Sequence, residues 1–292
     1  MSSFKEDLKF QYRVGGIANK LIFWNIGFFL LSIPLFYQFK SGVFDYPNWL
    51  AVSSEPNIVL TKPWTLIIYA FFHYAFNHLF FNMIALYFSS RLFLTFFTQK
   101  QFIGLYMLSA IFCSLCFILV FYVLGWQSMM VGASGAIMAL LMAVTTYQPS
   151  MDVRLLLIGY LKLWQITATI LLLNFLVMFI DTGGFIAHVS GAFFGYIYIK
   201  LLQNGTDLSR IVDSVLSLFR KKQSTPFKKV HINPKKPAVK RGTSGSELAK
   251  QSKIVVKDKT QQQLDEILDK ISQSGYDSLT SQEKEFLFKA GK

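Results

Sequence analysis

The sequence predicts an all-α fold, a polytopic membrane protein built as a bundle of six transmembrane helices. Hydrophobic residues make up 53% of the 292 residues and charged residues only 15%, a more apolar balance than that of ordinary soluble domains. Six apolar stretches follow one another within the first 202 residues. Residues 203–292 hold 18 of the 29 Lys and Arg residues, so an apolar body is followed by a basic tail.

This pattern predicts three segments: a cytoplasmic N-terminal segment (1–20), a membrane body (21–202) and a basic cytoplasmic tail (203–292). No small-residue cleavage site follows the first apolar stretch, so we expect that stretch to remain as a membrane anchor. Cys113 and Cys116 lie inside an apolar stretch without a second pair of ligands. We expect them to serve in packing and predict no metal site.

The predicted spans are residues 21–39, 74–97, 102–124, 134–147, 163–180 and 184–202. A spanning helix needs roughly 20 mainly apolar residues, and the fourth stretch, at about 21 Å, is too short to cross a bilayer unaided. We therefore expect a short, central fourth helix that is enclosed by the others and begins below the membrane surface. The preceding loop, residues 125–133, would then form the floor of an aqueous pocket.

An even number of spans places both termini on the same side of the membrane. The loops on that side are rich in Lys and Arg, whereas the opposite loops contain only Lys40 and Lys62. The positive-inside rule therefore predicts cytoplasmic termini, and we expect the protein in a bacterial cytoplasmic (inner) membrane. The outer loop 40–63 is rich in aromatic residues, which suits a segment at the level of the lipid headgroups.

Polar residues within the second predicted span are candidate functional residues, because such groups are costly in a bilayer. His78 and Asn82 are four residues apart, so they lie on one helix face, and His73 precedes them. Both side chains can donate an N–H to an oxygen that gains negative charge in acyl transfer. Alternatively, they form structural hydrogen bonds between helices.

The sequence Gly132-Ala133-Ser134-Gly135 places a serine where a tight turn becomes a helix. Unpaired backbone N–H groups and the helix dipole favour negative charge at this position, so Ser134 could be both a nucleophile and an oxyanion donor. Alternatively, Ser134 caps the helix and the glycines allow close packing. The motif differs from the Gly-x-Ser-x-Gly elbow of soluble hydrolases, since residue 136 is alanine.

His188 lies near the start of the sixth predicted span, and Gly191 and Gly195 follow it on the same helix face. Two helices can approach closely over small residues. The fourth span carries a matching stripe of small residues, namely Gly135, Ala139 and Ala143. We expect the two helices to pack along these faces, which would bring His188 close to the start of the fourth helix.

A serine hydroxyl is a poor nucleophile at neutral pH and needs a base within hydrogen-bond reach, for which neutral imidazole is the usual group. Within the outer halves of these spans, the one acidic residue is Asp181, at the mouth of the expected pocket. We therefore expect a dyad of Ser134 and His188 without a carboxylate. The histidine ring would be oriented by packing or by another polar group.

Taken in order, these motifs resemble the rhomboid family of intramembrane serine proteases, over about residues 20–202. The matching residues are His73 with His78-x-x-x-Asn82, then Gly132-Ala133-Ser134-Gly135, then Ala187-His188-Val189-Ser190-Gly191 with Gly195. The resemblance implies Ser134 as nucleophile, His188 as general base and then acid, and an oxyanion site of Asn82, His78 and the Ser134 N–H. It also implies single-span or polytopic membrane-protein substrates, cut near the outer end of a span, and no cofactor.

Two positions depart from the family pattern. The first outer loop of the family often carries Trp-Arg, whereas this chain has Trp64-Thr65. An aromatic residue often follows the serine by four positions; here that residue is Met138, whose thioether can also pack against a ring. Neither departure changes the nucleophile or the base, so we predict an active serine endopeptidase.

The tail is predicted to contain an amphipathic helix, a basic linker and a small helical hairpin. Apolar residues at helical spacing over 208–219 are typical of a helix that lies on the inner leaflet. The linker, 220–241, has nine Lys or Arg and no Asp or Glu, which favours anionic lipid headgroups over nucleic acid as its partner. In the hairpin, Gly275 separates two helices, and Thr280 and Glu283 fit a capping box.

A different class of function uses the same residues as structural links. A non-catalytic membrane protein that binds or remodels transmembrane helices would need the same polar groups between its helices. A transporter would more readily contain internal repeats, and the sequence contains no convincing one.

Overall fold

The computed structural model describes residues 4–155, 159–176, 178–219 and 259–290, and these residues are mainly helical. The chain forms two compact units, Met1–Ser224 and Thr225–Lys292. Within the described residues, four helices are long and apolar enough to cross a membrane: α2 (Gly16–Phe36), α5 (Phe76–Phe96), α6 (Gln99–Leu124) and α9 (Thr182–Gln203). Two shorter apolar helices are α7 (Ser134–Tyr147) and α8 (Leu163–Leu176).

The helices differ from the predicted spans mainly at their ends. α2 begins at Gly16 rather than at residue 21, and α8 ends at Leu176, so the predicted span 163–180 is too long. The predicted span was too long because the apolar sequence continues beyond the end of α8, into a turn over residues 178–180. α5 begins at Phe76, two residues later than the predicted span 74–97, because Ala75 is extended (φ −155°, ψ 157°), so His73 lies outside this helix.

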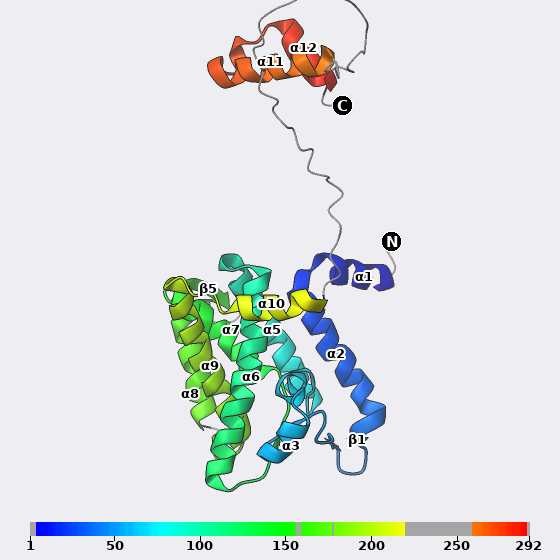
Figure 1. Cartoon of the computed structure of the whole chain (residues 1–292), viewed down its shortest axis with the longest axis vertical. Helices are drawn as coiled ribbons and strands as arrows, with labels where there is room; N and C mark the ends of the chain where they lie inside the picture. The colour runs from blue at the N-terminus through cyan, green and yellow to red at the C-terminus, as the bar shows by residue number, and fades with distance from the viewer. Residues whose placement is uncertain (1–3, 156–158, 177, 220–258, 291–292) are drawn as a thin grey trace, which may run out of the picture. The chain divides into compact units, whose positions relative to one another are not determined.

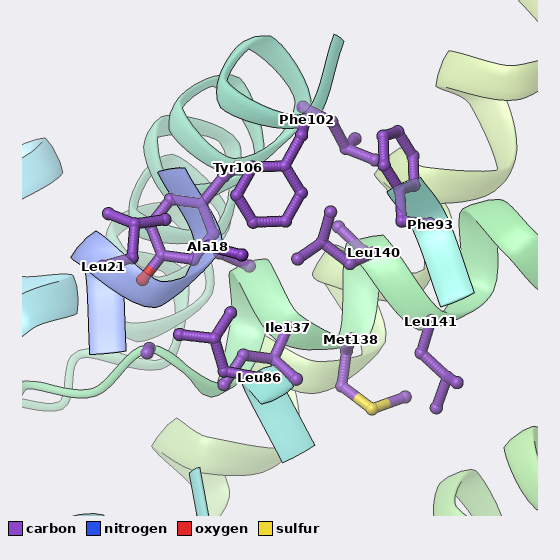
Figure 2. Packing of buried hydrophobic residues seen from close by; sticks show 14 of the residues in the cluster. Ala18, Leu21, Leu86, Phe93, Phe102, Tyr106, Ile137, Met138, Leu140 and Leu141 are labelled. Atoms are coloured by element: carbon purple, nitrogen blue, oxygen red, sulfur yellow. The ribbon is translucent and has the colours of Figure 1, made fainter. Parts of the chain in front are cut away.

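α7 lies among the other helices of the first unit. It packs against α5, α6, α8 and α9, and ten of its 14 residues are buried. Figure 2 shows the core around it, where Ile137 and Leu140 lie among apolar side chains from α2, α5 and α6. The labelled neighbours include Leu21, Leu86, Phe102 and Tyr106.

The contact between α7 and α9 is made by backbone against backbone. A Cβ atom added at Gly191 would lie 2.0 Å from the carbonyl oxygen of Gly135, and one at Gly195 would lie 2.3 Å from that of Ala139. No side chain larger than hydrogen fits at these two positions without moving a helix. The predicted packing of the two small-residue faces is therefore confirmed.

Short elements connect the helices and hold the segment before α7. Strand β3 (Val52–Ser53) pairs with β4 (Met129–Met130) in antiparallel fashion, which ties loop 40–63 to residues just before Ser134. Another pair joins β1 (Tyr37–Gln38) to β2 (Val43–Phe44). The remaining elements of these connections are α3 (Pro56–Thr61), α4 (Thr65–Ile68), η1 (Tyr69–Phe71), β5 (Asp152–Leu155) and β6 (Gly159–Lys162).

Two further helices of the first unit lie outside the apolar bundle, α1 (Phe4–Val14) and α10 (Ser209–Phe219). α10 packs on α6, as Figure 1 shows, and a Cβ atom at Gly104 would lie 2.4 Å from that of Ser209. Burial raises the pKa of the Asp207 carboxyl, but hydrogen bonds from Ser209 and Gln101 outweigh it and hold that pKa below its ordinary value. The amphipathic helix is thus part of the first compact unit.

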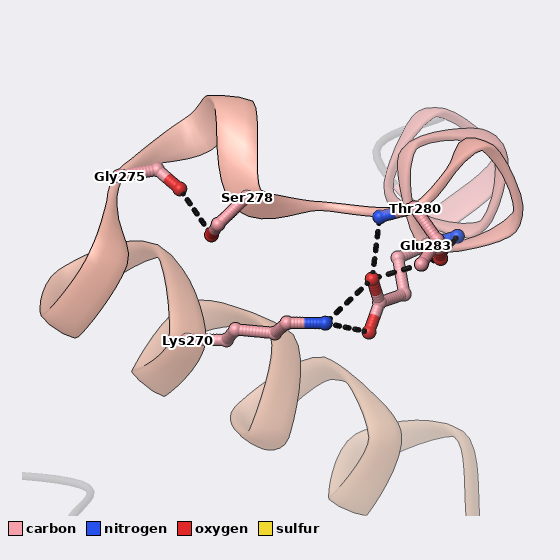
Figure 3. Close-up of polar contacts among 5 residues, drawn as sticks. All are labelled: Lys270, Gly275, Ser278, Thr280 and Glu283. Carbon is pink, nitrogen blue, oxygen red and sulfur yellow. Dashed lines mark hydrogen bonds and ion pairs between the residues drawn. The ribbon is translucent and has the colours of Figure 1, made fainter.

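The second unit is a helical hairpin of α11 (Lys259–Ser274), η2 (Tyr276–Ser278) and α12 (Ser281–Ala290). Figure 3 shows the predicted capping box, in which the Glu283 carboxylate accepts hydrogen bonds from Thr280 N (2.7 Å) and Oγ1 (2.8 Å). The same carboxylate binds Lys270 Nζ at 2.9 Å, and together these bonds lower the pKa of Glu283 to about 2. The predicted basic linker, 220–241, lies outside the described residues.

Candidate active site

A cavity of about 1520 Å³ contains four of the polar residues that the sequence singled out. Its walls come from α5, α7, α8 and α9, and its lining includes His78, Asn82, Ser134 and His188. The loop that was predicted to form a pocket floor contributes Trp126 and residues 128–132. The structure thus brings together candidates that lie up to 110 positions apart in the sequence.

Ser134 is the first residue of α7 and lines the cavity. The position before the helix is Ala133, which has helical φ and ψ angles, and no side chain caps the helix. Among the described residues, none forms a hydrogen bond with the Ser134 hydroxyl. The observed geometry therefore does not agree with the alternative in which Ser134 caps the helix.

Gly132 is needed for the approach of His78 to the segment before Ser134. Its φ angle is +132°, a value that side-chain-bearing residues rarely adopt. A Cβ atom at this position would lie 2.7 Å from Cε1 of His78 and 3.1 Å from its Nε2. The Gly132 N–H donates to the carbonyl of Tyr69 in η1 at 3.0 Å, which fixes the turn against η1.

Asn82 and His78 face the cavity from α5, as expected from their spacing. The Asn82 amide donates one N–H to the His78 carbonyl at 2.8 Å, and the amide has a second N–H to offer. The His78 ring lies against the Tyr74 ring, with ring centres 4.3 Å apart. His73 is fully buried, contacts the His78 ring at 5.0 Å between centres, and is absent from the described cavity lining.

His188 lines the cavity from α9, and its ring nitrogen Nδ1 is hydrogen-bonded to Oδ1 of Asn174 in α8. Asn174 was not predicted as a site residue from the sequence. Like Asn82, it is a polar side chain within an apolar stretch, which is the signal that could have identified it. Within the described residues, no hydrogen bond joins Ser134 to His188. The two side chains share one cavity, and catalytic hydrogen bonds are often long before substrate binds.

The predicted supporting glycines act through helix packing. Gly135, Gly191 and Gly195 lie in the contact between α7 and α9 rather than among the described lining residues of the cavity. A Cβ atom at Gly135 would lie 3.0 Å from the carbonyl oxygen of Ala187. The immediate neighbours of Ser134 and His188 in the chain are therefore in contact, which fixes the relative position of the two helix ends.

The two positions that depart from the family pattern have different surroundings. Thr65 is buried at the start of α4, and its hydroxyl donates to the Lys62 carbonyl at 2.8 Å. Met138 is buried one turn after Ser134 and lines the cavity. Thr65 thus stabilises the start of α4 locally, whereas Met138 forms part of the cavity wall.

Comparison with known protein families shows which family this chain resembles. Residues 60–204 match the family described as the Rhomboid domain. This chain belongs to the rhomboid family. The rhomboid match spans α5 to α9 and includes every predicted site residue. Because four apolar helices among the described residues are long enough to span a bilayer, this rhomboid protein is an integral membrane protein.

A second match lies outside the rhomboid domain. Residues 255–289 match a family of unknown function, DUF6576, and this range covers nearly all of the α11–α12 hairpin. No curated protein matches the chain. The hairpin of this rhomboid is therefore a recognisable unit of its own in sequence as well as in structure.

Proposed function

We propose that this rhomboid protein is an intramembrane serine endopeptidase that hydrolyses peptide bonds in or near transmembrane segments of other membrane proteins. The observation that carries the proposal is the cavity, which holds a serine hydroxyl without a hydrogen-bond partner among the described residues and a histidine whose Nδ1 is already bonded. A free hydroxyl and an available ring nitrogen are what nucleophilic catalysis needs. The reaction requires no cofactor.

In the first step, the Ser134 oxygen attacks the carbonyl carbon of the substrate while its proton moves to Nε2 of His188. The electron pair of the carbonyl double bond moves to the oxygen, which becomes an oxyanion. Asn82, His78 and the Ser134 N–H are the proposed donors to this oxyanion. His188 then gives its proton to the leaving amine as the C–N bond breaks, and water releases the acyl group from Ser134 by the reverse sequence of proton transfers.

We propose six spans for the membrane topology, α2 and α5 to α9, with both termini in the cytoplasm of a bacterial cell. α7 and α8 each have 14 residues, about 21 Å, and thus need either enclosure by longer helices or a locally thinner bilayer. The positive-inside distribution of Lys and Arg supports the orientation. Labelling of single cysteines in loop 40–63 and in α10 from either side of sealed vesicles tests it.

The proposed substrates are single-span or polytopic membrane proteins, whose segments would enter the cavity between α5 and α8. Apolar side chains from both helices line it, including Phe81, Phe88, Ile166 and Ile170. The basic segment 220–241 is the proposed contact for anionic lipid headgroups, and no nucleic-acid partner is expected.

The test uses the purified full-length protein in liposomes with a labelled single-span substrate. Ser134→Ala and His188→Ala should each reduce cleavage at least about 10³-fold. Ser109→Ala is the matched control, because among the described residues this buried serine in α6 bonds only to the Tyr106 carbonyl of its own helix. A fluorophosphonate probe should label wild type and the Ser109 variant, and leave Ser134→Ala unlabelled.

Helix binding without catalysis is the second candidate function. The observation that favours it is that, among the described residues, Ser134 and His188 are not hydrogen-bonded to each other. Cleavage by neither wild type nor variants, together with crosslinking of substrate to the cavity, would support this candidate. Undiminished cleavage by both Ser134→Ala and His188→Ala would instead show that another group is the nucleophile.

A further inference from the structure

We propose that Asn174 is a positioning residue of the active site, whose side-chain oxygen holds His188 in the tautomer that leaves Nε2 free to accept the Ser134 proton. The inference rests on the proposed protease function for its catalytic consequence. Its structural part, the tautomer of His188, can be measured independently of any activity.

The orientation of the Asn174 amide follows from its second hydrogen bond. Its Nδ2 lies 2.8 Å from the carbonyl oxygen of Ile170, one turn earlier in α8. A carbonyl oxygen only accepts hydrogen bonds, so the amide nitrogen must face Ile170. The amide oxygen is therefore the atom that faces Nδ1 of His188.

The tautomer of His188 follows from the same hydrogen-bond rules. The amide oxygen of Asn174 is an acceptor and has no proton to donate, so Nδ1 of His188 must carry the hydrogen. In a neutral imidazole the other nitrogen, Nε2, is then the acceptor. This is the form that a general base needs in order to take a proton from serine.

Asp181, the acidic group at the mouth of the cavity, is engaged elsewhere. Its Oδ1 accepts the Gly184 N–H at 2.8 Å and thereby caps the start of α9. Among the described residues, His78 from α5 and the Asp181 carboxylate are the titratable groups that interact electrostatically with His188. Of the described residues, Asn174 is the one whose side chain bonds the His188 ring.

The hydrogen bond persists through the proposed reaction. When Nε2 takes the Ser134 proton, the ring becomes an imidazolium and Nδ1 still donates to the Asn174 oxygen. The amide is neutral and takes no proton, so it orients the ring without becoming a charged partner. Asn174 thus fills the place that a carboxylate takes in the serine, histidine and aspartate triad.

The experiment measures the His188 tautomer and substrate cleavage in the full-length protein. The chain has four histidines, so ¹⁵N-histidine labelling gives a small set of ring signals, and the His188 signal is the one lost in His188→Gln. Wild type should have Nδ1 protonated and Nε2 unprotonated near neutral pH. Asn174→Ala should lose this preference and cleave about tenfold more slowly, the factor expected for one ordinary hydrogen bond.

Two further variants separate positioning from folding. Asn174→Asp retains an acceptor oxygen and should retain both the tautomer and most of the cleavage. Thr169→Val is the matched control on α8, because within the described part of the chain the exposed Thr169 hydroxyl bonds only to the Gln165 carbonyl of its own helix. It should behave as wild type in both measurements.

A wild-type His188 protonated at Nε2 would overturn the inference. Unchanged cleavage by the Asn174→Ala variant would also overturn it. In that case, loss of cleavage in Ser134→Ala would show that the protease proposal still stands. Protonation at Nδ1 in a wild-type protein that cleaves nothing would have a different meaning. It would overturn the protease proposal and the positioning role with it, and leave the hydrogen bond as a structural link between α8 and α9.

Discussion

α7 and α8 are apolar helices of the same length, and each presents a residue of the candidate active site to one cavity. They differ in burial: ten residues of α7 are buried, whereas in α8 only Leu163 and Thr167 are. The stripe of small residues lets α9 contact the backbone of α7, while α8 turns large side chains such as Leu173 outward. The proposed nucleophile is thus held on a tightly packed helix, and the residue proposed to orient the base is held on a loosely packed one.

Core truncation should give the largest difference between the two helices. Leu140 in α7 is fully buried and Leu173 in α8 is 56% exposed. Leu140→Ala should lower the free energy of unfolding by about 2–5 kcal/mol, because the cavity it leaves cannot close in a packed core. Leu173→Ala should change it by roughly 0.5 kcal/mol or less. Unfolding in mixed detergent micelles measures both, and equal losses would contradict the contrast between α7 and α8.

Opening the contact between α7 and α9 should have the next largest effect. In Gly191→Ala, the new methyl group would meet the Gly135 carbonyl oxygen at 2.0 Å, and neither backbone can yield locally. We expect a loss of about 1–3 kcal/mol in stability, with reduced cleavage because Ser134 and His188 move apart. Gly27→Ala in α2 is the control, because a Cβ atom there meets nothing within 4 Å. Wild-type stability and cleavage in Gly191→Ala would show that the helix contact does not set the positions of Ser134 and His188.

The smallest effect concerns the hydrogen bond that joins the two helices. Thr145 of α7 and Thr167 of α8 have their hydroxyl oxygens 2.7 Å apart in a buried setting. Thr145→Val should lower stability by about 0.6 kcal/mol, the average for hydrogen bonds between membrane helices. In the double variant, Thr167→Val should lower the stability little further, because both substitutions remove the same hydrogen bond. Fully additive losses, measured by the same unfolding assay, would exclude a direct coupling of α7 to α8 through this pair.

Features encoded by local patterns were predicted well. The limits of α7, residues 134–147, agree with its apolar stretch, and the stripes at Gly135 and Gly191 face each other as their spacing predicted. The Thr280 and Glu283 capping box was likewise readable from two residues and their spacing. Each of these depends on residues within a few turns of one helix or on one complementary face.

Features that depend on the rotation and placement of whole helices were not predicted. Asn174 meets His188 only because α8 turns that face inward, and the apolar residues around it give no preferred direction. The pairing of Val52 with Met130 joins segments far apart in sequence and involves two residues on each side. The packing of α10 on α6 over Gly104 is likewise invisible in the amphipathic pattern of α10, which fits a lipid surface equally well.

The glycine contact between α7 and α9 has a consequence for biosynthesis. Membrane proteins are made from the N-terminus, so α9, with His188, is the last of these apolar helices to leave the ribosome. Until then, α7 lacks the neighbour that covers its small-residue face, and Ser134 lacks its proposed base. A nascent chain would carry the proposed nucleophile in an unfinished site. Under the proposed function, proteins inserting at the same translocon are protected from cleavage until this last helix is in place.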